Sequence, residues 1–360
     1  MTKISCLPLL GVWISMYSLY LYLSIMLLSI IIVNFNSGDL IADCLHSAEP
    51  MLMDPAFVEW LIVDNSGNQQ DKELIQRQFP TAKWLEMGYN AGFARANNAG
   101  MRASKGELVL LLNPDTLLKP GVIMSACNRL LASTYIAAGV QLVHANGQPQ
   151  FSGSYFMKGG LNHLLPLPYW GAFLKGIVSL FVKEKPAFIE VPTNQQVDWI
   201  SGAFLMVKRE AFELTQGMDE SFFLYAEEVE WCNRLGKLGK LVIFGDLQIV
   251  HLIGQSIQEA SGAADNSYTN LSDKKGYQLM VSNHLRIRKQ YGIFWLFFQL
   301  INHAWAIPFS LLMGVMDYAI NGKSIKNGYS KWHGFSSNVF RLLGLIPKLL
   351  KPENHFFKYL

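Results

Sequence analysis

The chain has 360 residues, which is enough for one large domain or two modest ones. Of these residues 51% are hydrophobic and 16% are charged, and so little charge is unusual for a purely soluble enzyme. The net charge of +3 and the lack of a basic stripe with aromatics argue against nucleic acid as a partner, and four scattered cysteines argue against a disulfide framework or a zinc knuckle.

The N-terminal residues 1–26 are hydrophobic, and no charged residue occurs between Ile4 and Val33. A segment of this kind is typical of a signal anchor or transmembrane helix. However, it runs without a linker into an apolar strand, and Met26 stands just before that strand. A dispensable extension upstream of a misassigned start is therefore an equally open interpretation.

From residue 28 onward, apolar runs alternate with helical patterns. Strands are expected at 28–36, 58–63, 82–87, 107–112, 197–207 and 241–244, and helices at 38–47, 90–104, 121–132 and 226–238. Alternation of this kind predicts an α/β fold, Rossmann-like, with a mostly parallel central sheet and flanking helices. Residues 153–186 show no clear pattern.

Polar residues follow the first two expected strands. The first strand ends in the segment VNFN, which contains Val33, Asn34, Phe35 and Asn36. The second leads into the segment DNSG, which begins with Asp64 and Asn65. The carboxyl ends of parallel strands form the ligand-binding edge of such sheets, so these residues are expected to bind a nucleotide. Turn formation alone, which Asn, Asp, Ser and Gly favour, is the alternative.

The segment NAGFARANNAG, residues 90–100, leads into a helix. It lacks the spacing of a dinucleotide-binding fingerprint and of a P-loop. Arg95 and Asn97 are expected to face a phosphate or a sugar, with Gly92 allowing close approach. An ordinary helix start with a solvated Arg95 is the competing interpretation.

The segment ELVLLLNPDT ends a buried strand in Asn113, Pro114 and Asp115. Proline stops the strand because it has no N–H to donate. The carboxylate of Asp115 is thus delivered to the ligand-binding edge, where its usual purpose is to hold a metal ion or a phosphate ligand through one.

The segment DESFFLYAEEVEW, residues 219–231, is rich in acids. Glu230 and Arg234 are four residues apart and are expected to form a surface pair. Glu228 shares its helix face with Cys232 and Leu235, so its pKa should rise toward the range of a general base. Further on, His251 follows an apolar stretch. It is interpreted as a metal ligand beside Asp115, with a structural histidine as the alternative.

Residues 290–316 carry no formal charge and are long enough to span a bilayer. They also contain Gln299, Asn302, His303 and Pro308, and basic residues flank them on both sides. Because a single span predicts an asymmetric distribution of Lys and Arg, we expect a helix or helical hairpin on an anionic membrane surface. A buried helix pair is the alternative.

Taken together, these segments resemble the family 2 glycosyltransferases of the GT-A fold, close to bacterial rhamnosyltransferases. They run in the family's order from about residue 28 to 256: SIIIVNFNSGDL, LIVDNSG, NAGFARANNAG, LLLNPDT, WISGAFLMVKREAF, MDESFFLYAEEVEWCNRLGKLG and VHLIGQS. The resemblance implies domains at 27–265, for sugar transfer, and 266–360, for membrane association.

The resemblance also implies roles for single residues. Asp64 matches the acid that recognises the base, and Asp115 the last acid of the metal motif, whose first acid is Asn113 here. Glu228 stands where the family has its catalytic base, and His251 matches the histidine that completes the metal site. Residues that match the acceptor pocket are Trp199 and Gly202, with Glu227 beside the base.

The activity implied is a single inverting displacement with Mn²⁺ or Mg²⁺ as cofactor. The donor is a nucleotide-sugar, dTDP-rhamnose or a UDP-linked sugar, and the acceptor a lipid-linked saccharide of O-antigen, capsule or exopolysaccharide assembly. The location implied is the cytoplasmic face of the bacterial inner membrane. A binding module without catalysis is the alternative, and two apolar segments are too few for a multi-span polysaccharide synthase.

Overall fold

The computed structural model describes residues 27–179, 189–252, 270–321 and 325–360. The expected extension 1–26 and the end of the VHLIGQS segment, residues 253–256, lie outside this part of the chain. The main strands are β1 (Leu28–Asn34), β2 (Val58–Asp64), β3 (Lys83–Glu86), β4 (Leu108–Leu112), β5 (Thr116–Leu117), β6 (Ala137–Val143), β8 (Gln195–Val197), β10 (Phe204–Lys208) and β11 (Leu241–His251).

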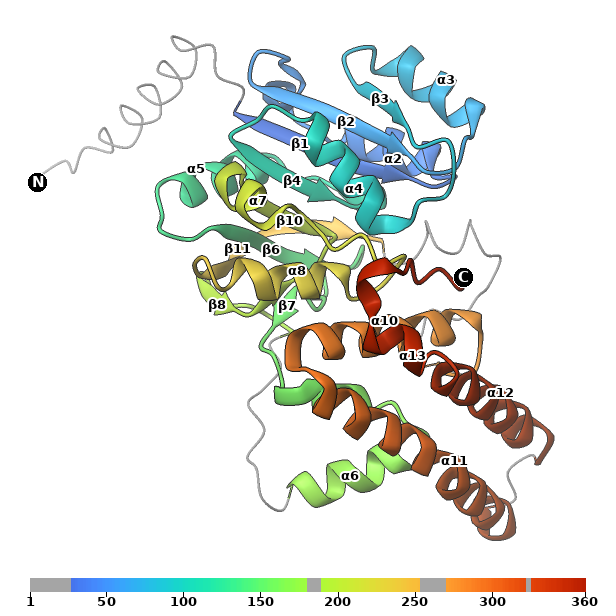
Figure 1. Cartoon of the computed structure of the whole chain (residues 1–360). Coiled ribbons are helices and arrows are strands. Elements are labelled where there is room, and N and C mark those ends of the chain that lie inside the picture. The colour runs from blue at the N-terminus through green and yellow to red at the C-terminus, as the bar shows by residue number, and fades with distance from the viewer. Residues whose placement is uncertain (1–26, 180–188, 253–269, 322–324) are drawn as a thin grey trace, which may run out of the picture.

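These strands form one sheet in the order β3-β2-β1-β4-β10-β6-β11-β5, with β8 also paired to β11 (Figure 1). Strands β3, β2, β1 and β4 pair in parallel, and so do β6 and β11. Strand β10 lies antiparallel between β4 and β6. The predicted α/β fold with a mostly parallel sheet is confirmed.

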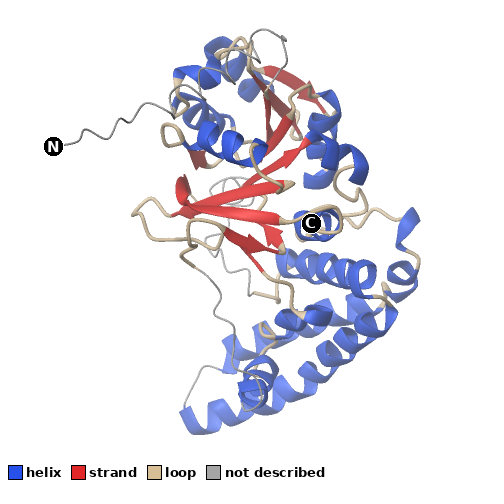
Figure 2. Ribbon diagram, turned by 90° about the vertical axis from the view of Figure 1, so that its left-hand side faces the viewer, coloured by secondary structure: helices blue, strands red, loops and turns tan. Residues whose placement is uncertain are grey.

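The period-two alternation of the buried strands divides the core into two layers. Ile30 and Ile32 of β1 face one layer, whereas Ile31 faces the other. The first layer includes α2 (Gly38–His46), α3 (Gln69–Gln78) and α5 (Val122–Leu131), and the second includes α4 (Gly92–Ala103), α7 (Arg209–Thr215) and α8 (Glu227–Leu235). Figure 2 shows the strands between these helices.

The single strand expected at 197–207 is wrong, because the chain turns at Ser201-Gly202-Ala203. Phe204 N–H donates to Ser201 O at 3.3 Å across this turn. Before the turn, β9 (Trp199–Ile200) leaves the main sheet and pairs with β7 (Gly153–Ser154). The turn brings Gly202 toward α8, as described below.

The C-terminal region is helical and lies below the sheet in Figures 1 and 2. It contains α10 (Lys274–Tyr291), α11 (Ile293–Asn321), α12 (Ile325–Leu343), α13 (Ile346–Leu350) and η3 (Pro352–Asn354), while η1 (Pro50–Met53) lies near β2. Two elements of the unassigned 153–186 stretch, η2 (Lys158–Leu164) and α6 (Trp170–Ser179), join this helical layer. Gln299 of α11 donates to Gly159 O at 2.9 Å, and the rings of Trp170 and Phe309 lie 5.1 Å apart.

The last residues return from the helices to the sheet domain. Phe357 is fully buried, and its N–H donates to Ser221 O at 2.9 Å. Lys358 donates to Asn90 O at 2.8 Å. The tail therefore joins the helical layer to the two loops that precede α4 and α8.

Candidate active site

A cavity of about 920 Å³ opens where the carboxyl ends of the strands meet the C-terminal helices. Val33, Asn65, Asn113 and His251 line it at the strand end, and Arg286 lines it at the helical end. Glu227 and Glu228 line it as well. The cavity therefore combines residues from the carboxyl ends of the strands, two carboxylates and a helical arginine.

At the ends of β1 and β2, two of the expected nucleotide residues are engaged in holding the loops. Asn34 is buried and donates to Asp64 Oδ1 at 3.1 Å. Asp64 also accepts from the N–H groups of Ser66 and Gly67, each at 3.0 Å. The carboxylate of Asp64 thus shapes the loop that places Asn65 in the cavity wall.

Asn36 lies at the surface, outside the cavity lining. Its backbone has a left-handed φ of 54°, and its side chain accepts from Asn68 at 3.4 Å. Asn tolerates this conformation better than most residues. Of the four residues expected at the end of the first strand, Val33 and Phe35 line the cavity.

Gly92 lines the cavity, and its φ of 81° requires glycine. A Cβ at this position would meet Phe223 O at 2.3 Å. Phe93 N–H donates to the same carbonyl at 2.8 Å. The close approach expected here is therefore made to the backbone before α8.

Neither Arg95 nor Asn97 lines this cavity, so their expected contact with a phosphate or a sugar stays a prediction. Arg95 Nε donates to Glu220 O at 3.1 Å, and its guanidinium lies 3.7 Å from the centre of the Phe356 ring. Asn97 is buried and donates to Phe93 O, one turn earlier in α4.

His251 lines the strand end of the cavity, and the buried Asp115 lies in contact with it. Asp115 is buried, and its Oδ1 accepts no hydrogen bond from the described residues. His251 Nε2 lies 3.4 Å from that oxygen and 3.4 Å from the amide of Asn113. On the other side of the ring, His251 Nδ1 lies 3.0 Å from Gln150 Oε1.

This arrangement fits a divalent cation held by two protein ligands. Two ligand atoms that are each about 2.1 Å from one ion lie about 3.4 Å apart when the angle between them is near 110°. Gln150 orients the ring, as second partners of metal-bound histidines commonly do. Among the described residues no group of three His, Cys, Asp or Glu forms a complete metal site, so a bound phosphate would have to supply further oxygens.

The acid pair Glu227 and Glu228 begins α8. Burial raises the pKa of Glu228, as its apolar neighbours predicted. Burial, and then the charge of Glu228, raises the pKa of Glu227 well above its ordinary value. Two consecutive left-handed residues, Tyr225 and Ala226 with φ of 72° and 66°, turn the chain just before the pair.

The expected acceptor residues Trp199 and Gly202 line the same cavity. A Cβ at Gly202 would lie 3.7 Å from Glu228 Cγ and 3.5 Å from the Phe93 ring. The ring of Trp199 lies 5.5 Å from that of Phe151. Glu228 therefore stands next to open backbone and an aromatic wall.

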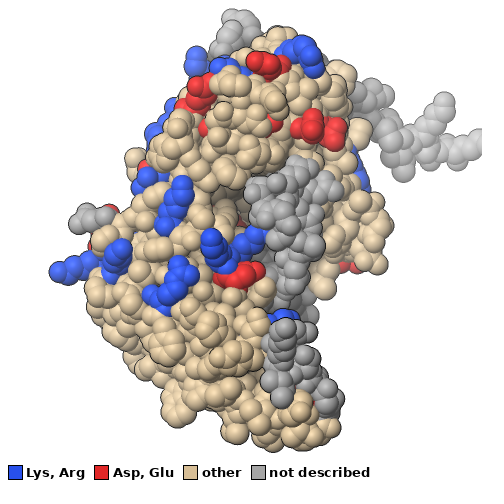
Figure 3. Space-filling model, turned by 90° about the vertical axis from the view of Figure 1, so that its right-hand side faces the viewer, with Lys and Arg blue, Asp and Glu red and all other residues tan. Residues whose placement is uncertain are grey.

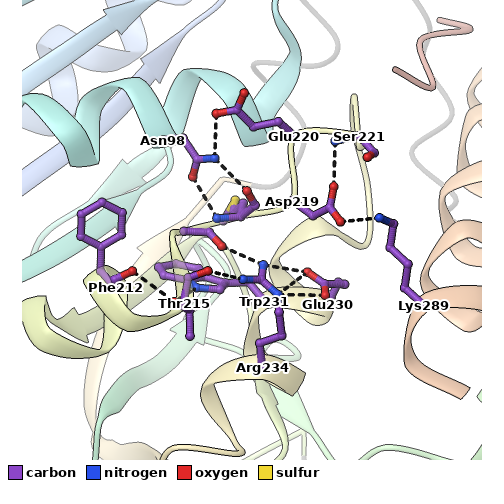
Figure 4. A network of polar contacts seen from close by, with 12 residues as sticks. Asn98, Phe212, Thr215, Asp219, Glu220, Ser221, Glu230, Trp231, Arg234 and Lys289 are labelled. Carbon is purple, nitrogen blue, oxygen red and sulfur yellow. Dashed lines mark hydrogen bonds and ion pairs between the residues drawn. The ribbon is translucent and has the colours of Figure 1, made fainter. Parts of the chain in front are cut away.

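Figure 4 shows the polar network that holds residues 215–221, the segment ahead of α8. Arg234 pairs with Glu230 at 2.8 Å and also donates to the carbonyls of Thr215 and Gly217. Asp219 pairs with Lys289 of α10 at 2.6 Å. The expected surface pair Glu230–Arg234 is thus largely buried, and it organises the loop before α8.

Sequence reasoning missed three residues that shape the cavity: Gln150, His163 and Arg286. Gln150 follows a short turn, and no pattern marks it. His163 lies in the stretch that had no assignment. For Arg286 the sequence did offer an indication of burial, because the residue is charged and stands among apolar positions of a helix. It is also one of the basic residues that flank the apolar segment 290–316, and that role explained its charge without a cavity.

Three comparisons with known proteins agree with this geometry. Residues 29–195 match the family model described as glycosyl transferase family 2. The chain is 27% identical over 235 residues to the N-acetylglucosaminyl-diphospho-decaprenol L-rhamnosyltransferase of Mycobacterium tuberculosis, covering 60% of this chain and 73% of that one. It is also 27% identical over 208 residues to the dTDP-rhamnosyl transferase RfbF of Shigella flexneri, covering 56% of this chain and 62% of that one.

Among solved structures, the fold is similar to that of the mannosyltransferase PcManGT from Pyrobaculum calidifontis in complex with GDP-Man and Mn²⁺. The TM-score is 0.50 with 15% identity, and the match covers 91% of this chain and 88% of that one. At this identity the likeness concerns the fold.

Proposed function

This chain carries a family 2 glycosyltransferase domain on the GT-A fold, and from that premise we propose that it transfers L-rhamnose from dTDP-rhamnose to a hydroxyl of a lipid-linked saccharide. The names of the two rhamnosyltransferase relatives support the sugar, and the mycobacterial one supports a lipid diphosphate as carrier. The product would enter surface-polysaccharide assembly.

The observation that carries the proposal is that His251, which contacts the buried Asp115, and Glu228, whose pKa is raised, line one cavity. Asp115 Oδ1 stands without a hydrogen bond beside His251, and Glu228 stands in the cavity wall next to Gly202. A binding module has no use for a buried base with a raised pKa. Sugar transfer needs both groups.

In the proposed reaction Glu228 takes the proton of the acceptor hydroxyl while that oxygen forms a bond to the anomeric carbon. The bond from this carbon to the donor phosphate breaks in the same step, and the nucleoside diphosphate leaves with inversion. Asp115 and His251 would hold a divalent cation, Mn²⁺ or Mg²⁺, which when bound neutralises charge on a diphosphate. Val33 and Asn65 would line the nucleotide pocket, and Trp199 the acceptor pocket.

Association with the cytoplasmic face of the inner membrane is part of the proposal. The helix α11 is long and apolar enough to cross a membrane, but by length and composition alone. Its polar residues Gln299 and His303 are buried against the protein, whereas Phe294 is 70% exposed and Trp305 63% exposed. An apolar face turned outward supports a helix lying on lipid.

The test is a transfer screen with the purified chain. A panel of nucleotide-sugars is offered with an N-acetylglucosaminyl diphosphate lipid, with Mn²⁺, Mg²⁺ or EDTA. We expect metal-dependent use of dTDP-rhamnose. Glu228→Gln should lower kcat by about 10²–10⁴-fold, since general-base catalysis contributes that much, and Asp115→Ala should abolish the response to metal.

Glu210→Gln is the matched control, because Glu210 is an exposed carboxyl on α7 and should keep full activity. Full activity of Glu228→Gln would refute the assigned base. Use of a UDP-linked sugar in place of dTDP-rhamnose would correct the donor while retaining the enzyme.

A further inference from the structure

The helical end of the cavity contains a buried guanidinium without an acidic partner. Arg286 of α10 is 3% exposed and lines the cavity. Within the described parts of the chain no carboxylate lies within ion-pair distance of it, and its Nε makes no hydrogen bond. A buried charge is costly unless a counter-charge compensates it.

The groups that do contact Arg286 are neutral. One terminal nitrogen lies 2.6 Å from His163 Nε2, and the other donates to Gln290 Oε1 at 2.5 Å. Burial, followed by the charge of Arg286, holds the pKa of His163 well below its ordinary value. His163 therefore accepts as a neutral imidazole, and neither of these two contacts supplies a negative charge to Arg286.

Two more groups at this end extend the same surface. His284 donates from Nδ1 to Met280 O at 2.7 Å, which leaves its Nε2 buried and without a partner among the described residues. Its ring lies 4.6 Å from that of His303, which also lines the cavity. Lys275, half-buried on α10, adds a second permanent cation to the lining.

We propose that Arg286, with Lys275, forms a subsite for the diphosphate of a polyisoprenyl-linked acceptor. The proposal rests on the proposed function for the existence of that acceptor. A guanidinium binds phosphate oxygens in a fixed fork, and buried Arg is the residue best suited to this. Glu228 also lines the cavity and interacts electrostatically with Arg286, but it makes no ion pair with it, so the guanidinium remains available to a phosphate.

The position of the subsite suits such an acceptor. Arg286 is close enough to Glu228 for its charge to lower the pKa of that carboxyl, so a sugar attached to the bound diphosphate lies near the base. The exposed apolar face of α11 begins at Ile293, immediately beyond the end of α10. A lipid chain leaving the diphosphate would continue along that face, away from the nucleotide end.

The experiment measures binding without donor or turnover. The full chain is titrated calorimetrically with farnesyl diphosphate, farnesol and inorganic diphosphate in EDTA, so that no cation at Asp115 contributes. The wild type should bind farnesyl diphosphate at least tenfold more tightly than either other ligand. Arg286→Met should lose at least tenfold of that affinity, and Lys275→Met at least threefold.

Arg288→Met is the control, because this substitution removes the same charge from the same helix, at a residue that does not line the cavity. It should bind as the wild type does. Lys275 is half-buried, and its side chain makes no hydrogen bond with the described residues. Lys275→Met should therefore fold, and it keeps the test decisive if Arg286→Met does not.

Unchanged affinity in both cavity variants would overturn the subsite, and so would farnesol binding as tightly as farnesyl diphosphate. Inorganic diphosphate binding equally well would assign the site to a soluble anion and overturn the lipid source. A chain that transfers sugar but fails this test loses only the subsite. A chain that passes it but transfers no sugar loses only the proposed function.

Discussion

At the scale of single residues, the acid pair that begins α8 sets how this protein responds to pH. Glu227 is 2% exposed and its Oε2 has no hydrogen-bond partner among the described residues. Burial therefore penalises its charged form, which raises the pKa above the reference of 4.5. The folded protein holds this proton more tightly than the unfolded chain does.

The sign of the effect on stability follows from that difference. As pH rises from about 4.5 through the raised pKa, the folded state must lose a proton that the unfolded state has already lost, so stability falls. We expect Glu227→Gln to raise the free energy of unfolding above this window and to have no such effect below pH 4.5. Each pKa unit of upward shift corresponds to about 1.4 kcal/mol.

Urea unfolding of wild type and Glu227→Gln between pH 4 and 8 measures this difference. Glu210→Gln, an exposed substitution on α7, serves as the control and should follow the wild-type curve. A Glu227→Gln curve that runs parallel to wild type across the whole range would show that this carboxyl is not destabilised by burial.

Single residues also show how far local sequence goes in predicting a site. Asp115, Glu228 and His251 were expected from strand ends and helix faces; the structure places Glu228 and His251 in the lining of one cavity and Asp115 in contact with His251. Arg95 matched a phosphate ligand equally well by sequence, yet it packs on Phe356 from the far end of the chain. A contact between residues 261 positions apart in sequence leaves no local trace.

At the scale of elements, the C-terminal tail stabilises the site by packing. Phe357 is fully buried in the same core as Trp231 and Met280. Its carbonyl accepts from Gln278 of α10 at 3.0 Å, while its N–H donates to Ser221. This strap connects α10 to the loop that leads into Glu228.

We expect Phe357→Ala to lower the free energy of unfolding by about 3–5 kcal/mol, as large-to-small changes of a buried phenylalanine do. Phe340→Ala is the matched control, because that ring is exposed and its loss should stay within about 0.5 kcal/mol of wild type. Equal unfolding midpoints for the two variants in urea would show that the tail does not stabilise the fold.

At the scale of the whole molecule, charge and apolar surface are unevenly distributed. Figure 3 shows Lys and Arg across the middle of one face and few charges toward the lower end, where Figure 1 places the ends of α6 and α11. Exposed apolar side chains recur along α11 at Phe294, Ile301, Trp305 and Leu312. This distribution supports docking of that end on an anionic bilayer.

We expect the chain to co-sediment with phosphatidylglycerol vesicles. The double substitution Phe294→Ser and Trp305→Ser should weaken this binding at least tenfold, because burying a large apolar side chain contributes about 1.5–3 kcal/mol. Leu214→Ser with Leu238→Ser removes exposed apolar residues from the sheet domain and should bind as wild type does. Equal loss in both double variants would place the lipid contact elsewhere.

The sequence by itself determined the layers of this protein and the chemistry of its strand ends. The apolar runs within 28–36 and 58–63, and the stop at Pro114, are local properties, and they determined the sheet and the position of Asp115. Local periodicity carries such information because it reflects which face of an element is buried.

Only the tertiary structure decided how the C-terminal helices meet the rest of the chain. In the folded protein the expected strand is interrupted at Gly202, and η2 and α6 lie against α11. Folding also brings Arg286 into contact with His163, which lies 123 positions earlier. These contacts depend on the packing of distant segments, where burial changes the charge balance of a side chain far more than its neighbours in sequence do. At this end of the cavity the sequence offered one sign, the charge of Arg286 among apolar helix positions, and it gave no sign of the contact with His163.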